Sequence, residues 1–252
     1  MKLSSLIILG SLVVLCSCGN ESFDKPVDKE KQEAELYESG NIKSSGQYGE
    51  NKKKEGLWIS YYESGNVQDS TFYKNDYPNE RSVAYHENGR KLSEGSFEDG
   101  KAVGEWLFWN EEGRLEEKSN WTDGKPDGLG QTFYEKNKIQ SEVNWSNGIM
   151  NGEWKSYYED GTVSELTFYQ NGMKDGVAQS FYPNGNLKAE MKFELEIPNG
   201  SMIEFHENGT VASEVEYIQG KMEGNRFFYD TIGGIIRTEI YVGGILDTNI
   251  TH

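Results

Sequence analysis

The sequence predicts an all-β protein, an elongated antiparallel meander of about nine 24-residue β-hairpin repeats. Glycines recur every 24 residues from Gly65 to Gly233, with Asn137 as the one substitute, and Gly40 precedes the series by 25 residues. Aromatic residues recur at fixed distances from these marks. A strict period of this length is typical of arrays in which each repeat packs against its neighbours.

Two sets of aromatic residues follow the period. One lies eight residues after each mark: Tyr48, Tyr73, Phe97, Trp121, Trp145, Tyr169, Phe193, Tyr217 and Tyr241. The other lies four residues before each mark from Gly65 on: Tyr61, Tyr85, Trp109, Phe133, Tyr157, Phe181, Phe205 and Tyr229. A hydrophobic content of 35% and a net charge of −17 would otherwise favour disorder. Regularly spaced aromatic side chains supply the apolar area that aliphatic residues do not.

Each repeat has the pattern of a hairpin, with two alternating runs on either side of a loop such as Glu159-Asp160-Gly161. We expect the aromatic four residues before the glycine and the aliphatic two residues after it to be buried. A three-residue loop pairs Tyr157 with Val163 and places Gly161 in the left-handed region, where glycine has no steric cost. The second strand should then alternate, with Val163, Glu165, Thr167 and Tyr169 on one face and Ser164, Leu166 and Phe168 on the other.

A second turn joins one hairpin to the next and carries glycines four residues apart, such as Gly172 and Gly176. Asp76, Glu80 and Glu196 replace these glycines, so we expect bends or loosened linkers there. Any activity should lie in these irregular copies, around residues 76–91 and 194–200, and in exposed aromatic residues. The apolar residues of the final segment should form a terminal cap: Ile235, Ile236, Ile240, Ile245 and Leu246.

The first residues have the pattern of an export signal. Lys2 is followed by an apolar run from Leu6 to Leu15, too short for a membrane span. Leu15-Cys16-Ser17-Cys18 resembles the lipobox of bacterial lipoproteins, which implies lipidation of Cys18. The predicted organisation is a lipoprotein signal peptide at 1–17, the lipidated Cys18 and a flexible tether at 18–35, a repeat array at 36–233, and a C-terminal half-repeat or cap at 234–252.

Two other interpretations of this segment remain open: an ordinary cleaved signal peptide, and a disulfide between the two cysteines. A disulfide across one intervening residue would be strained. With lipidation, the expected location is the cell envelope of a bacterium, anchored by lipid at the outer membrane or cell surface.

The charge of the chain limits its partners. A net charge of −17 does not suit nucleic acid or an anionic membrane surface. The single basic cluster, Lys52-Lys53-Lys54, is flanked by acidic residues. The sequence contains no nucleophile–base constellation, no phosphate loop and no dinucleotide-binding pattern. We therefore expect no enzyme activity, no cofactor and no nucleic-acid partner.

The repeat resembles the bacterial variant of the MORN repeat, a group that includes antitoxin-like repeat proteins. The resemblance rests on the run aromatic-Tyr-Glu-Asn/Asp-Gly, the aliphatic and aromatic that follow, and Asn/Asp-Gly-Lys-x-x-Gly, over residues 36–246. It implies an antiparallel β-hairpin array that binds or scaffolds, with no shared catalytic residues.

One slot of the repeat, three residues before the glycine, holds candidate binding residues on the face opposite the buried aromatic: Tyr62, His86, Tyr134, Tyr158, Tyr182 and His206. The alternative is that this slot accepts any half-exposed aromatic. A metal shared by His86 and His206 would require the sheet to close, so we expect no metal site. The acidic turns lack the carboxylate spacing of known calcium loops, and turn chemistry explains their Asp and Asn residues.

The first functional hypothesis is a lipid-anchored scaffold for protein–protein interaction. The second is a glycan-binding surface lipoprotein, in which sugars stack on the Tyr/His row. An antitoxin- or immunity-like binding protein is the third and rests on the resemblance alone.

Overall fold

The computed structural model describes residues 6–7 and 32–252. These residues fall into two compact units, which divide between Gly113 and Arg114. The uniform sequence period does not indicate this division. The predicted signal peptide, except for residues 6–7, and the tether up to residue 31, including Cys18, lie outside the described residues. No helix among the residues described is long and apolar enough to cross a membrane.

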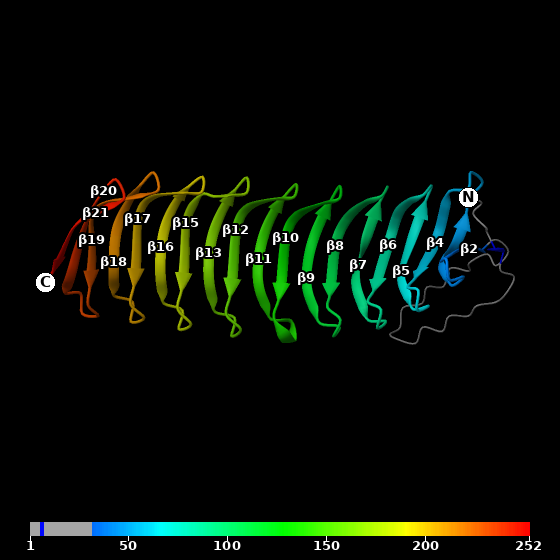
Figure 1. Cartoon of the computed structure of the whole chain (residues 1–252), viewed down its shortest axis with the longest axis horizontal. Coiled ribbons are helices and arrows are strands. Elements are labelled where there is room, and N and C mark those ends of the chain that lie inside the picture. The colour runs from blue at the N-terminus through cyan, green and yellow to red at the C-terminus, as the bar shows by residue number, and fades with distance from the viewer. Residues whose placement is uncertain (1–5, 8–31) are drawn as a thin grey trace. The chain divides into compact units, whose positions relative to one another are not determined.

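The N-terminal unit is an antiparallel meander in which each strand pairs with the next along the chain. Its strands are β1 (Leu6–Ile7), β2 (Gln32–Leu36), β3 (Ile42–Tyr48), β4 (Lys54–Tyr61), β5 (Val67–Lys74), β6 (Tyr77–Tyr85), β7 (Lys91–Glu98) and β8 (Lys101–Trp109). Consecutive strands lie side by side in Figure 1.

The C-terminal unit continues the same pattern of antiparallel neighbours. Its elements are β9 (Leu115–Thr122), β10 (Lys125–Phe133), the short 3-10 helix η1 (Glu135–Asn137), β11 (Ile139–Ser146), β12 (Ile149–Tyr157), β13 (Val163–Gln170), β14 (Met173–Lys174), β15 (Gly176–Phe181), β16 (Leu187–Glu194), β17 (Ile197–Phe205), β18 (Val211–Ile218), β19 (Lys221–Tyr229), β20 (Ile235–Val242) and β21 (Ile245–Thr251). The prediction of an all-β antiparallel meander is confirmed for each unit.

The hairpin turns have the predicted geometry. Tyr157 pairs with Val163, and Gly161 has φ 94° in the left-handed region. Asn137 takes the same conformation with φ 57°, and the adjacent Lys136 has φ 61° within η1. The three-residue loop and its left-handed glycine are therefore confirmed.

The predicted alternation along β13 is interrupted at its start. The register shifts between Ser156 and Tyr157, so Ser164 and Glu165 of β13 form a bulge opposite Ser156. Ser164 Oγ lies 2.7 Å from Ser156 Oγ, so Ser164 faces the same side as Ser156 and its pairing partner Glu165. The expectation that Ser164 and Glu165 lie on opposite faces is wrong, because the loop closes through a bulge.

The irregular linker turns keep the geometry of the regular ones. Asp76, Glu80 and Glu196 adopt φ values of 74°, 65° and 70°, in the left-handed region that the replaced glycines would occupy. The amide of Glu196 donates to Lys174 O at 2.8 Å, just as the amide of Gly172 donates to Met150 O at 2.8 Å. The prediction of loosened linkers is wrong, because the hydrogen bond to the preceding linker holds the turn.

The row that we expected to be buried is only half-buried. The aromatics four residues before the glycine and most aliphatics two residues after it are half-buried, and Ile235 is exposed. The most buried side chains instead lie near the middle of the strands: Trp58 and Val83 are each 1% exposed. The core therefore lies along the strands of the sheet, away from the hairpin loops.

The last hairpin, β20–β21, leaves its apolar side chains exposed. Ile245 is 74% exposed, and the exposed group also includes Ile235, Ile236, Val242, Leu246 and Ile250. A terminal repeat normally presents a polar outer surface. The hairpin predicted as a cap is thus present, with an apolar surface.

Candidate binding face

The tryptophans at one position of the repeat lie on one face of each unit, and we call it the tryptophan face. It is defined by Trp58 and Trp106 in the N-terminal unit and by Trp154 in the C-terminal unit. Each strand contributes one residue to a central row on this face, and cross-strand pairing joins these residues, as in Trp58 with Thr71 and Trp154 with Thr167. The row contains several of the most buried side chains, such as Trp58, Trp106 and Thr167.

The central row combines large and small residues. A Cβ atom added to Gly46 would lie 2.4 Å from the Trp58 ring, and one added to Gly95 would lie 2.1 Å from the Trp106 ring. Both distances are far below contact, so only glycine fits beneath each indole. These two glycines are strand residues, unlike the glycines of the turns. Their backbone conformation is one that any residue can adopt, and glycine is required because a side chain would clash with the indole.

A second row on the tryptophan face consists of the aromatics eight residues after each mark. Tyr73, Tyr169 and Phe193 pair with Gly56, Gly152 and Gly176 of the preceding strands. Those glycines have positive φ and mark a bulge near each linker. In the first repeats the aromatics also contact the central row, as with Tyr48 and Trp58, whose ring centroids are 4.8 Å apart at 67°.

A third row carries hydroxyl and carboxylate groups. In the N-terminal unit, Ser44 and Tyr48 each donate a hydrogen bond of 2.8 Å to Glu35. Burial acts to raise the pKa of Glu35, but these two hydrogen bonds and the charge of Lys54 outweigh it and hold the pKa below its usual value. Burial and the hydrogen bond to Glu35 raise the pKa of Tyr48. The cluster therefore contains an ionised carboxylate and a neutral phenol at neutral pH.

The predicted Tyr/His row is half-buried, and its polar tips bond to the neighbouring repeat. Each ring reaches the backbone carbonyl that lies 23 residues further along the chain. The pairs are Tyr62 with Tyr85 O, His86 with Trp109 O, Tyr134 with Tyr157 O, Tyr158 with Phe181 O, Tyr182 with Phe205 O and His206 with Tyr229 O, at 2.7–2.9 Å. Because the row joins consecutive repeats, it has a structural role. A role in binding stays a prediction.

The turns are also joined from repeat to repeat. Asn66 Nδ2 donates to Glu87 O at 2.8 Å, and Asn186 Nδ2 donates to Glu207 O at 2.9 Å. At the linker edge, the amide of Asn147 donates to Asp127 Oδ1 at 3.2 Å. Asn and Asp therefore serve both as turn formers and as links between neighbouring turns.

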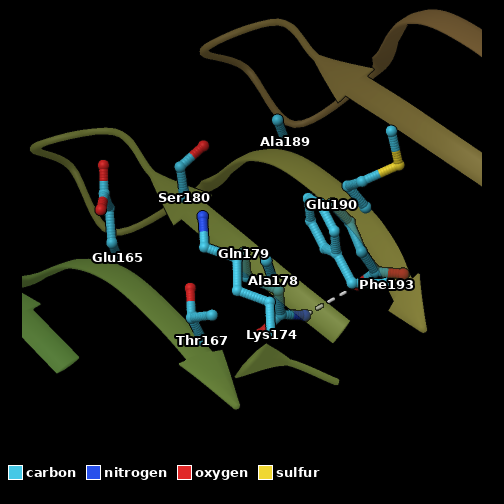
Figure 2. A pocket seen from close by; sticks show the side chains of 10 residues that line it. Glu165, Thr167, Lys174, Ala178, Gln179, Ser180, Ala189, Glu190 and Phe193 are labelled. Carbon is cyan, nitrogen blue, oxygen red and sulfur yellow. Dashed lines mark hydrogen bonds between the residues drawn. The ribbon is translucent and has the colours of Figure 1, made fainter. Parts of the chain in front are cut away.

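The tryptophan face has a hollow in the C-terminal unit. The hollow has a volume of about 230 Å³ and is lined by residues of β13, β14, β15 and β16. Figure 2 shows Glu165, Thr167, Lys174, Ser180 and Phe193 around it. Lys174 Nζ lies 5.4 Å from the centroid of the Phe193 ring. Charged, hydroxyl and aromatic groups thus surround one small concave site.

The described residues contain no group of three or more His, Cys, Asp or Glu side chains arranged to hold a metal ion. His86 and His206 lie in different units, each bonded to its own neighbouring carbonyl.

Sequence reasoning missed the central row and the hollow. The signal for the row was present in the positions of Gly46 and Gly95, which lie six residues after a marker glycine and outside any turn. The signal for the hollow was Ala178, which occupies the slot of Trp58, Trp106 and Trp154. Neither signal can be interpreted without the strand register, which shows which positions of the repeat lie side by side.

Comparison with known proteins identifies the repeat. Five segments match the model of the MORN repeat variant: residues 54–75, 126–147, 150–171, 174–194 and 198–219. No curated protein sequence matches the chain. A chain in the solved structure titled "Crystal Structure of TcdB2-TccC3-TEV" is 11% identical, with a TM-score of 0.20. The match covers 84% of this chain and 14% of that one, and a TM-score of this size does not establish a shared fold. The chain is therefore a repeat protein in which five segments match the MORN repeat variant.

Proposed function

We propose that this chain is a non-enzymatic repeat protein of the bacterial cell envelope, anchored by lipid at Cys18, and that it binds another protein through its tryptophan face. The observation that carries the proposal is the arrangement of this face. Aromatic, small and hydroxyl-bearing residues lie in parallel rows along hydrogen-bonded strands, and the face has a hollow.

The composition of the face fits a protein partner. Aromatic side chains supply large contact areas with little loss of conformational freedom, and they dominate the energetics of protein interfaces. The hydrogen bonds between neighbouring repeats hold the face in one shape before binding, which lowers the entropic cost of association.

Photo-crosslinking tests protein binding. A photoreactive phenylalanine analogue at Phe193 lies on the tryptophan face, whereas the same analogue at Phe168 lies on the reverse face, where the native ring is 41% exposed. We expect a discrete crosslinked protein from position 193 in intact envelopes and none from position 168. Equal crosslinking from both positions, or none from position 193, would contradict the proposal.

Lipid anchoring is tested separately. The Cys18→Ala variant should leave the membrane fraction and lose metabolic lipid labelling, because the thiol that accepts the lipid is absent. The Cys16→Ala variant is the matched control and should remain membrane-bound. Retained labelling of the Cys18 variant would reject the assignment.

The glycan hypothesis has less support, because the hydroxyl groups of Tyr158 and Tyr182 donate to backbone carbonyls at 2.7 Å. Loss of glycan-array binding after Tyr158→Ala, which removes the stacking ring, with the fold retained, would favour it. The antitoxin- or immunity-like role has no additional support from the geometry.

A further inference from the structure

The hollow on the tryptophan face marks the absence of a large side chain from the central row. Ala178 lies there, whereas the equivalent positions 24 residues before and after it carry Trp154 and Met202. The residues around Ala178 are also small, since Thr167, Ser180 and Ala189 line the hollow. The space that a side chain fills in the adjacent repeats is open here.

The N-terminal unit shows what an occupied version of this site contains. Lys54, Trp58 and Tyr73 occupy the same repeat slots as Lys174, Ala178 and Phe193, 120 residues earlier. Lys54 Nζ lies 4.1 Å from the centroid of the Trp58 ring and 5.5 Å from that of Tyr73. In the C-terminal unit Lys174 Nζ lies 5.4 Å from the centroid of the Phe193 ring, so the cation and the second aromatic are present. The indole between them is missing.

One difference sets the depth at which a ring can bind. Trp58 lies directly on Gly46, whereas Thr167 occupies the equivalent slot beside the hollow. A ring in the hollow must therefore lie higher than Trp58 does. Trp154 provides a precedent, because it lies between Val143 and Thr167, both of which carry branched side chains.

We infer that the hollow binds one aromatic side chain with a hydrogen-bond donor, tryptophan or tyrosine, presented by the partner protein. The inference rests on the proposed function, because it names the group that the protein partner inserts. The inserted ring lies against Met191 and Phe193, takes the place of the missing indole, and receives the Lys174 cation on its face. Sulfur–aromatic and cation–π contacts of this kind are favourable.

Polar groups at the rim suit the N–H or O–H of such a ring. Glu165, Thr167 and Ser180 line the hollow. Among the side-chain hydrogen bonds and ion pairs of the described residues, none involves these three side chains. The donor of the ligand ring can therefore bond to an oxygen at the rim without breaking a bond within the repeat.

The test uses the full chain with the methionine methyl groups labelled with ¹³C, and N-acetyl-tryptophanamide as the probe. The sequence has six methionines, so each methyl signal can be assigned by substitution. We expect the Met191 signal to shift upfield with saturation, because an aromatic ring stacks against it, while the Met150 and Met222 signals stay in place. N-acetyl-leucinamide is the matched probe without a ring and should shift none of them.

Two variants sharpen the result. Ala178→Trp fills the hollow from within and should weaken probe binding by about tenfold or more, as expected for blocking an anchor pocket. Lys174→Gln should weaken binding by several-fold, whereas Lys192→Gln, which changes a lysine outside the hollow, should not. An unmoved Met191 signal, an equal shift of all methionines, or a shift with N-acetylglucosamine in place of the indole probe would overturn the inference.

This titration and the crosslinking experiment together separate this inference from the proposed function. Crosslinking of a protein from position 193, together with an unmoved Met191 signal, would retain the protein-binding face and reject the aromatic site. A saturable Met191 shift without any crosslinked protein would retain the site and reject the protein-binding function.

Discussion

The repeat around Trp58 and the repeat around Ala178 have the same strand pairing and differ in what fills the centre of the sheet. Trp58 pairs with Thr71, and Ala178 pairs with Met191 at the equivalent register. In the first repeat the indole is 1% exposed and covers a glycine, whereas in the second the same place is a hollow of about 230 Å³. One repeat backbone therefore supports either a filled core or an open site, depending on the set of residues in the central row.

The largest effect should come from emptying the filled repeat. Trp58→Ala removes an almost fully buried ring and should reduce the free energy of unfolding by about 3–5 kcal/mol. Urea denaturation followed by circular dichroism measures this change. Trp58→Phe is the control and should cost less. A midpoint unchanged by the alanine substitution would show that the indole is not part of the core.

Gly46→Ala should be the next largest change. The added Cβ would lie 2.4 Å from the Trp58 ring, so the ring must move, at a cost of about 1–3 kcal/mol. Gly49→Ala is a matched control in the same part of the chain, because its Cβ would meet no atom closer than 3.8 Å. Equal melting temperatures for the two variants would contradict the close packing of the indole.

Filling the hollow should increase the free energy of unfolding, in contrast to the two preceding changes. Ala178→Trp places apolar surface in the hollow and should stabilise the chain by about 0.5–2 kcal/mol. The control is Ala178→Ser, which adds no ring and should give no such gain. Destabilisation by the tryptophan would mean that Thr167 prevents a ring from entering, and would restrict the hollow to smaller ligands.

The cations of the two repeats should also differ. Lys54→Met removes a cation 4.1 Å from the Trp58 ring and should cost about 0.5–1 kcal/mol. Lys174→Met should cost less, since its nearest ring centroid is 5.4 Å away. Thermal unfolding of both variants gives the comparison. A larger loss for Lys174 would show that its amine already has a stabilising role without a ligand.

The smallest expected effect is a pH dependence of the stability that arises from Glu35. Its folded-state pKa lies below the usual value, so its contribution is present above the unfolded pKa of about 4.3 and is lost as the pH falls through the folded pKa. Stability should therefore decrease on acidification in this range, and Glu35→Gln should flatten that decrease. Chemical denaturation at a series of pH values tests it, and identical profiles for the two proteins would exclude Glu35 as a source.

The turns were predictable because their causes are local. A glycine such as Gly161 takes a positive φ regardless of what packs on the sheet, and its period of 24 residues fixes the number of hairpins. The bulge at Ser164 was not predictable from alternation, because it arises when the loop closes and shifts the register of the neighbouring strand.

The candidate site was predictable only in part. The Tyr/His row was recognised as a repeat slot with half-exposed side chains, and the structure places them so. Its bonds from Tyr158 and Tyr182 to the next repeat were not evident, because they join residues 23 apart along the chain. The hollow at Ala178 emerges only when neighbouring strands are compared at their true register.

The sequence by itself determined the all-β class, the period, the hairpin loops and the left-handed glycines, because backbone sterics and alternation act over a few residues. The tertiary structure decided which slots form the core. It showed that Trp58 covers Gly46, that the linkers at Asp76 and Glu196 keep their turns, and that Ala178 leaves an open place. The burial of a residue depends on the residues that face it on the two neighbouring strands. The bulge in each repeat shifts the register between strands, and the sequence of one strand alone does not reveal that shift.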